Sequence, residues 1–200
     1  MKKSQETKRC LIDSTKMLLK QAKAITIKDI CDNAEVNSAA VNYHFGDKEA
    51  LISIAINEIL DGLKAKITEK LSGALPSDEE TLLMFLDLVY NFSVENIGVL
   101  SYMFSFSDAS GDNKFLDTFL RDTSFTAIVF QKIDGMHETK NSPEANAAKF
   151  MALFSTFLMP MFCEYGMMKY GWHMELGKYS LQNSEFRKHY LIQLYKILKA

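Results

Sequence analysis

Apolar residues recur at helical spacing over most of this 200-residue chain, and few residues interrupt the pattern. Spacings of three, four and seven residues place side chains on one face of a helix. The chain has three prolines and nine glycines, so helix-breaking positions are rare. Hydrophobic residues make up 48% of the composition, which is enough for a substantial core. The pattern predicts an all-α chain of one large or two modest domains.

Residues 26–45 predict two short helices joined by a tight turn. Thr26 stands three residues before Asp29, so its hydroxyl can cap the first helix while the carboxylate favours the positive helix start. Asn37 can cap a second helix after a turn of about three residues. The two helices therefore form a helix-turn-helix.

The second of these helices has an apolar and a polar side. We expect Val36, Val41 and Phe45 to face inward. The outward side chains are small or form hydrogen bonds, and none is a carboxylate: Ser38, Ala39, Asn42, Tyr43 and His44. Such a surface can approach a polyanion.

Two further helices flank this pair. The first is expected over residues 5–22, packed beneath the pair as part of a three-helix head. Asp47 can cap the other, which continues to about residue 70 and joins the head to the rest of the chain. Lys48 lies in its first turn, where free N–H groups favour an anion. We expect Lys48 and this helix end to hold a phosphate.

The remainder of the chain predicts a helical bundle. Ser77 and Glu80 form a capping box, which predicts a helix start. Later helices are expected over about 96–106 and in a segment that ends at Gly135. Another begins at Ser142 and Pro143 and should kink at Pro160. A last helix covers 184–199. The two final helices carry apolar stripes broader than one core needs, so we expect a dimer interface there. Its candidate residues are Phe150, Phe157, Tyr165, Phe186, Tyr190, Leu194 and Ile197.

Most of the 14 phenylalanines and 11 methionines lie beyond residue 80. Side chains of this kind can line an adaptable apolar pocket, and they can equally fill a core. Both readings stay open for the candidate pocket residues Phe85, Tyr90, Met103, Phe104, Phe119, Phe154 and Met161.

Charge is unevenly distributed although the net charge is only −2. Residues 1–48 hold nine Lys or Arg and six acidic residues, a balance of +3, so the other 152 residues carry −5. A basic head on an acidic body suits a protein that places one end on DNA.

Other chemistry finds little support in the residues. The four histidines do not stand at ligand spacings with carboxylates or cysteines, and no phosphate loop or nucleophile elbow occurs, so we predict no metal, no cofactor and no enzyme.

Cys10, Cys31 and Cys163 are read as buried free thiols, with redox sensing as the alternative. We find neither an apolar signal region nor a span of about 20 apolar residues, and we expect a cytoplasmic protein without a membrane partner.

Residues 34–51 read AEVNSAAVNYHFGDKEAL. This segment closely resembles the DNA-binding signature of TetR-family transcriptional regulators, in the variant with Val-Asn-Tyr-His-Phe, and the resemblance covers roughly the first 55 residues. Two features depart from the family: Glu35 stands where glycine is usual, a position that often favours positive φ, and residues 20–25 are shorter than usual and lack a glycine.

The resemblance implies a homodimer that binds a palindromic operator in double-stranded DNA and is released by a small, hydrophobic effector, most simply as a repressor. It implies a helix-turn-helix domain at 1–48, a connecting helix at 49–72 and an effector-binding and dimerisation domain at 73–200. Phosphate contacts would come from Thr26, Tyr43, His44 and Lys48, and base contacts from Ser38, Ala39, Ala40 and Asn42. The alternative is a helical protein-interaction module with a vestigial head, which Glu35 and the weakly basic second helix favour.

Overall fold

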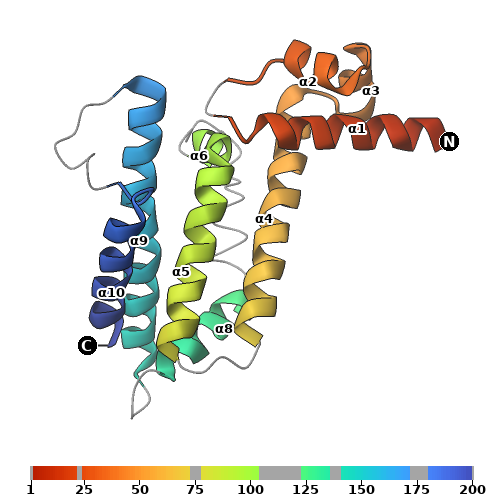
Figure 1. The fold of residues 1–200 in the computed structure, drawn as a ribbon. Coiled ribbons are helices and arrows are strands. Elements are labelled where there is room, and N and C mark those ends of the chain that lie inside the picture. Colours follow the sequence, from red (N-terminus) through yellow and green to blue (C-terminus); the bar gives the residue numbers. More distant parts are fainter. Residues whose placement is uncertain are drawn as a thin grey trace.

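The computed structural model describes residues 2–21, 24–72, 78–103, 123–135, 141–171 and 180–199, and every regular element in these ranges is a helix. Figure 1 shows a small head beside a longer body, linked by one long helix. The helices are α1 (Lys2–Leu18), α2 (Ile27–Ala34), α3 (Ala39–Phe45), α4 (Lys48–Ser72), α5 (Asp78–Glu95), α6 (Ile97–Met103), α8 (Thr123–Asp134), α9 (Pro143–Tyr170) and α10 (Ser184–Lys199). The all-α prediction is confirmed.

In the head, α1, α2 and α3 pack around a small apolar centre. Leu11 and Thr15 of α1 are fully buried, as their spacing predicts, and Val41 of α3 is fully buried as well. The prediction that the first helix reaches residue 22 is wrong. The helix ends at Leu18, and the Gln21 N–H donates to the Leu18 carbonyl oxygen at 3.0 Å in the turn that follows.

Helix α4 begins with the predicted cap, because Asp47 Oδ1 accepts the Ala50 N–H at 2.7 Å. It packs against α1 and α3 at one end and against α5 and α8 toward the other. One face is buried along much of its length, including Leu51, Ala55, Ile59, Leu60, Leu63 and Ile67. Helix α4 therefore connects head and body through buried apolar contacts.

In the body, α9 begins as predicted: Ser142 accepts the Ala145 N–H at 3.2 Å, and Pro143 opens the helix. It continues helically through Pro160 to Tyr170. Helix α8 is followed by Gly135, as expected. Helix α6 begins at Ile97, close to the predicted start, whereas residues 104–106 of the predicted segment and the Ser77 cap lie outside the described residues.

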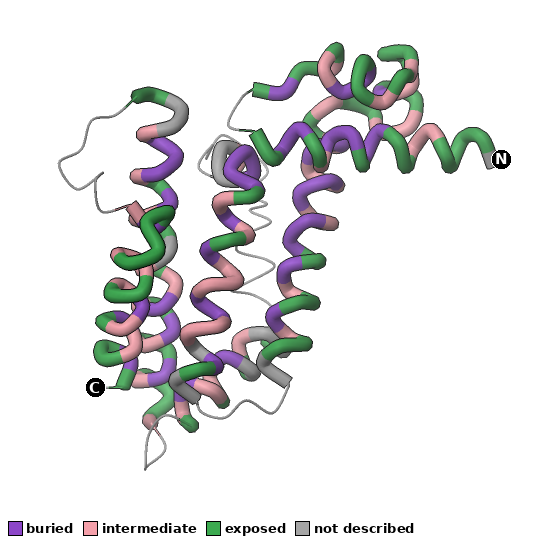
Figure 2. The backbone as a smooth tube through the Cα atoms, viewed as in Figure 1, coloured by how far each residue is buried: buried purple, intermediate pink, exposed green. Residues whose placement is uncertain are grey.

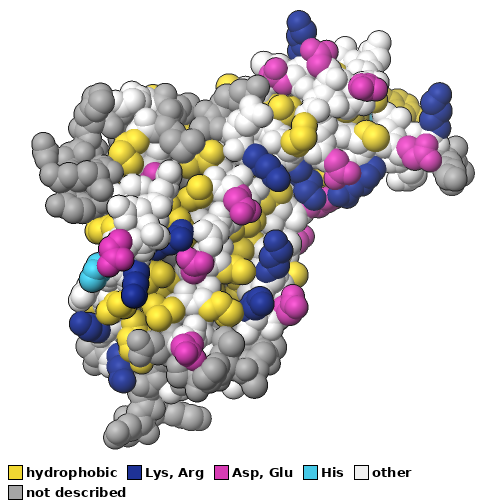
Figure 3. Space-filling model, in the orientation of Figure 1, with side chains coloured by type: hydrophobic (Ala, Val, Ile, Leu, Met, Phe, Trp, Pro, Cys, Tyr) yellow, Lys and Arg dark blue, Asp and Glu magenta, His cyan; other side chains and the backbone are white. Residues whose placement is uncertain are grey.

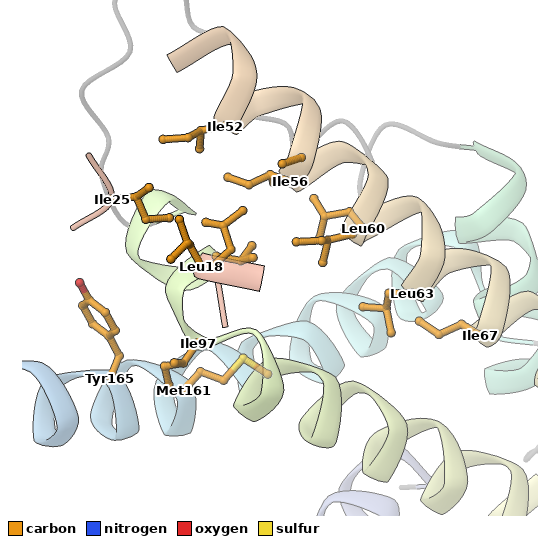
Figure 4. Close-up of a cluster of buried hydrophobic side chains, with 14 of the residues drawn as sticks. Leu18, Ile25, Ile52, Ile56, Leu60, Leu63, Ile67, Ile97, Met161 and Tyr165 are labelled. Carbon is orange, nitrogen blue, oxygen red and sulfur yellow. The ribbon is translucent and has the colours of Figure 1, made fainter. Parts of the chain in front are cut away.

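Head and body share one hydrophobic core. Figure 4 shows Leu18 and Ile25 of the head beside the α4 side chains Ile52, Ile56 and Leu60, with body residues beyond them. In Figure 2 the buried positions follow the facing sides of α4, α5 and α9. Because a close-packed core transmits strain, a shift of a body helix must therefore displace side chains at the base of the head.

The segment Pro143–Met167 of α9 is long and apolar enough, by length and composition alone, to cross a membrane. The expectation that no such segment exists needs this correction. A core helix of a soluble protein passes the same test, and α9 packs against α5, α6, α8 and α10. Its Glu164 is buried and accepts hydrogen bonds from Ser180 and Gln182.

Candidate nucleic-acid interface

The first helix of the pair is fixed by a reciprocal cap. The Asp29 N–H donates to Thr26 Oγ1 at 3.1 Å, and the Thr26 N–H donates to Asp29 Oδ2 at 2.9 Å. The Thr26 hydroxyl also donates to Asp29 Oδ2 at 2.6 Å. These bonds satisfy free backbone groups at the start of α2 and confirm the predicted cap.

The turn between α2 and α3 depends on Glu35. This residue has φ 54° and ψ 41°, in the left-handed region, and it is the one non-glycine residue with positive φ in the described ranges. The next N–H, from Val36, donates to the Cys31 carbonyl oxygen at 3.1 Å and closes the helix end. A left-handed non-glycine residue costs about 1–2 kcal/mol. Glu35 thus adopts the left-handed conformation that glycine takes without steric cost.

The start of α3 differs in detail from the prediction. Asn37 Oδ1 accepts the Ala39 N–H at 2.8 Å, so Asn37 does act on the helix start. The residue directly before the helix is Ser38, which has helical dihedral angles and no side-chain capping bond. Val41 fixes the inner face of α3, with Val36 and Phe45 half-buried beside the core.

The outer face of α3 is open to solvent. Tyr43 is 80% exposed, and Ser38, Ala39 and Asn42 are exposed as well. His44 and Ala40 are half-buried, and the His44 ring meets the Tyr43 ring edge-on with centroids 4.9 Å apart. Figure 1 places α3 at the outer side of the head, away from the body. The structure thus brings six of the eight predicted DNA-binding residues onto or beside one short helix.

Lys48 is engaged within the head. Its Nζ donates to the Ile25 carbonyl oxygen at 3.3 Å and lies 3.2 Å from Glu49 Oε1. These contacts join the start of α4 to the residue before Thr26. Lys48 therefore positions the helix pair, and phosphate binding would need an exchange of its partners.

Ion pairs also engage other basic residues of the head. Both Arg9 and Lys16 of α1 bind Glu58 of α4, with nitrogen–oxygen distances of 3.0 and 3.1 Å, and Arg9 also pairs with Asp13. Figure 3 shows basic and acidic side chains adjoining one another beneath the head. A count of charges could not reveal this pairing. Exposed lysines remain on the head at Lys3, Lys20 and Lys28.

The candidate pocket residues divide into three groups. Phe85, Tyr90 and Met161 are buried, on the neighbouring helices α5 and α9. Phe154 is half-buried and packs against Phe150, with ring centroids 4.6 Å apart. Of the others, Phe104 and Phe119 lie outside the described residues, and the Met103 side chain is not described.

The predicted dimer residues need a correction. Phe150, Tyr165 and Leu194 are buried within the chain, so they are not available to a second copy. The reason is that α9 and α10 pack on each other and on α5. Phe186 and Tyr190 are half-buried, Ile197 is 62% exposed, and the Phe157 side chain is not described. The exposed apolar side chains of α9 are Met151, Leu158, Met159 and Phe162.

The cysteines only partly follow the prediction. Cys31 is buried, and burial raises the pKa of its thiol, with a smaller contribution from the charge of Asp32. Cys10 is exposed and Cys163 half-buried, so the expectation of three buried thiols is wrong. Among the described residues, no group of three or more His, Cys, Asp or Glu side chains could hold a metal ion.

The capped helix, tight turn and exposed second helix define a helix-turn-helix head of the DNA-binding type. Residues 11–53 match a family model described as bacterial regulatory proteins, tetR family. This match supports TetR-family membership and a DNA-binding transcriptional regulator, as the sequence resemblance predicts. Searches of the curated proteins and of the solved structures found no match to this chain.

Proposed function

We propose that this protein is a cytoplasmic, ligand-responsive transcriptional regulator that binds a palindromic DNA operator as a homodimer. The observation that carries the proposal is the outer face of α3, which is open to solvent and free of carboxylates, and whose turn is closed by the Val36–Cys31 and Ala39–Asn37 hydrogen bonds. A helix of this kind enters the major groove with its exposed side chains toward the bases.

Base reading falls to Ser38, Ala39, Ala40 and Asn42. An asparagine amide can form two hydrogen bonds with an adenine edge, and alanine methyl groups can contact the methyl group of thymine. Each good contact contributes about 1–3 kcal/mol of discrimination. We therefore expect half-sites weighted toward A and T.

Phosphate contacts fall to Tyr43 and His44, with Thr26 taking part after its hydroxyl releases Asp29 and Lys48 after it releases Ile25. Such contacts set the register of the protein on DNA and carry no sequence information. Because Arg9 and Lys16 are already paired with Glu58, we expect the salt dependence of binding to reflect the exposed lysines more than the formal charge of the head.

A second copy would pack against the exposed apolar face of α9. Met151, Leu158, Met159 and Phe162 are exposed and follow helical spacing, which is typical of an interface seam. Met159→Glu should give a monomer in sedimentation, whereas Met17→Glu, at an exposed methionine of α1, should leave the dimer intact. A dimer unaffected by Met159→Glu would place the interface elsewhere.

Repression and its release follow from two states of the dimer. An effector can lower DNA affinity only as far as it favours a head spacing that the operator does not accept. The shared core of head and body supplies the mechanical link, because α4 is buried against both. We propose that a small, largely apolar effector binds in the body and releases DNA.

A selection from random duplex DNA tests the proposal. We expect enrichment of a palindrome whose half-sites lie about one helical turn apart. Asn42→Ala should relax the preference at one position of each half-site and leave the rest. Equal weakening on every sequence would make Asn42 a phosphate contact. Failure to enrich any sequence at low salt would favour the interaction module with a vestigial head.

A further inference from the structure

Among the described residues of the body, most buried polar side chains have a hydrogen-bond partner, and the atoms without one are the Tyr90 hydroxyl and the Asn146 amide oxygen. On α5, the Ser93 hydroxyl donates to the Val89 carbonyl oxygen at 2.7 Å, and directly after this helix the Asn96 amide donates to the Phe92 carbonyl oxygen at 2.8 Å. On α9, the buried Glu164 accepts from Ser180 and Gln182. These groups are satisfied within the fold and need no ligand.

Tyr90 of α5 is different. Its side chain is 3% exposed, and its hydroxyl has no hydrogen-bond partner in the part of the chain that the structure describes. The half-buried Tyr190 of α10 offers a direct comparison, because its hydroxyl donates to the Thr156 carbonyl oxygen at 2.6 Å. A buried hydroxyl without a partner costs about 1–3 kcal/mol, so a molecule that supplies the missing partner recovers that free energy.

The ring of Tyr90 is covered from the α10 side. The guanidinium carbon of Arg187 lies 5.0 Å from the ring centroid, and Asp87 and Asn91 hold Arg187 in place at 3.3 and 3.1 Å. The neighbouring helices α5 and α9 bury apolar side chains, among them Phe85 and Met161. The ring is therefore fixed, while its hydroxyl is left for another group.

The charges around Tyr90 select against an ionic ligand. Burial raises the pKa of Tyr90 to about 12, and the charge of Glu164 adds to the effect more than Arg187 opposes it. A ligand carboxylate would meet the same negative potential. A ligand ammonium has no lone pair and so cannot accept the hydrogen bond that the Tyr90 hydroxyl has to donate. A neutral oxygen acceptor has neither disadvantage.

We propose that the effector is a neutral amphipathic molecule whose carbonyl or hydroxyl oxygen accepts a hydrogen bond from Tyr90, with its apolar part between α5 and α9. This inference rests on the proposed effector-binding function of the body. It refines the expectation of a small, hydrophobic effector by adding one polar group at a defined position.

A matched series of probes tests this assignment: butylbenzene, benzylacetone, phenylbutyrate and phenylbutylamine share a phenyl ring and a short chain and differ in the polar group. By calorimetry on the full chain, benzylacetone should bind most tightly. Tyr90→Phe should weaken benzylacetone by about tenfold, the loss of one buried hydrogen bond, and leave butylbenzene unchanged. No binding of benzylacetone, or equal binding to the variant, would overturn the proposal.

The variants without ligand give an independent measurement. Tyr90→Phe should unfold at the same temperature as the wild type or higher, because it removes a hydroxyl that has no partner. Tyr190→Phe, the control, should lower the melting temperature and leave benzylacetone binding unchanged. A lower melting temperature for Tyr90→Phe would show that the hydroxyl is already satisfied, and would refute the assignment.

DNA binding measured in parallel separates this inference from the proposed function. Loss of the benzylacetone preference with intact DNA binding would refute only the ligand assignment. Absence of DNA binding with an intact preference would refute the regulator and leave the Tyr90 site standing.

Discussion

Gly98, near the start of the body helix α6, lies against the backbone of Leu19, directly after the head helix α1. A β-carbon at Gly98 would stand 2.5 Å from the Leu19 carbonyl oxygen, and the Gln21 carbonyl oxygen is equally close. Real β-carbons do not approach backbone oxygens so closely, so this contact requires glycine. It is a direct backbone contact between head and body, beside the shared core of Leu18 and Ile97.

Gly98→Ala should therefore lower the free energy of unfolding by about 1–3 kcal/mol, as overpacking in a close contact does. Gly62→Ala is the matched control, since Gly62 lies in α4 with no atom within 4 Å of an added β-carbon. That variant should gain about 0.5–1 kcal/mol, because alanine favours a helix more than glycine. Urea unfolding measures both. Equal effects of the two substitutions would show that α6 does not press on α1.

Glu35→Gly should stabilise the protein by about 0.5–1 kcal/mol. Glycine adopts the left-handed conformation of residue 35 without steric cost, which outweighs its greater freedom in the unfolded chain. Glu35→Ala keeps the strain and should bring no such gain. If thermal unfolding shows both variants alike, the strain at this turn is relieved in another way.

Thr26→Ala should cost about 1 kcal/mol of stability through loss of the α2 cap, and Thr26→Ser should restore most of it. The same pair tests the proposed phosphate contact, because serine also keeps the hydroxyl. DNA affinity that falls with alanine and returns with serine supports both roles. Stability unaffected by alanine would mean that the cap contributes little.

Much of the head could be predicted from sequence because its determinants are local. The Thr26–Asp29 cap, the Asp47 cap and the inward position of Val41 depend on residues within a few positions of one another. The outward face of α3 follows from the same spacing. Local rules were sufficient there.

Contacts between distant parts of the chain could not be predicted in this way. Lys48 appears free in the sequence, yet it bonds to the Ile25 carbonyl, and Arg9 is paired across the helices with Glu58. Phe150 and Leu194 have the pattern of an interface, yet neighbouring helices of the same chain bury them. Periodicity shows which face of a helix is apolar, but it does not show what covers that face. The unpaired hydroxyl of Tyr90 likewise has no signal in sequence.

Tyr90 also predicts a pH dependence at the alkaline end. The unfolded phenol loses its proton near pH 10, whereas the folded pKa is about 12, raised by burial and by Glu164 and Asp87 against the opposing charge of Arg187. Stability present below pH 10 is therefore lost as the pH rises toward 12, by up to about 1.4 kcal/mol for each pH unit. Denaturant unfolding between pH 10 and 12 should show a smaller loss of stability for Tyr90→Phe than for the wild type. Parallel curves for the two proteins over this range would contradict the assignment.

The central claim is that the exposed face of α3 binds duplex DNA, and fluorescence anisotropy with the selected operator tests it most directly. Wild-type protein should bind as a dimer, with an affinity that falls as salt rises. Tyr43→Ala should weaken binding on every sequence by about tenfold or more while leaving the fold intact, since Tyr43 is 80% exposed. A wild-type protein that stays monomeric and binds no duplex at low salt, or a Tyr43→Ala variant that binds as the wild type does, would contradict the claim.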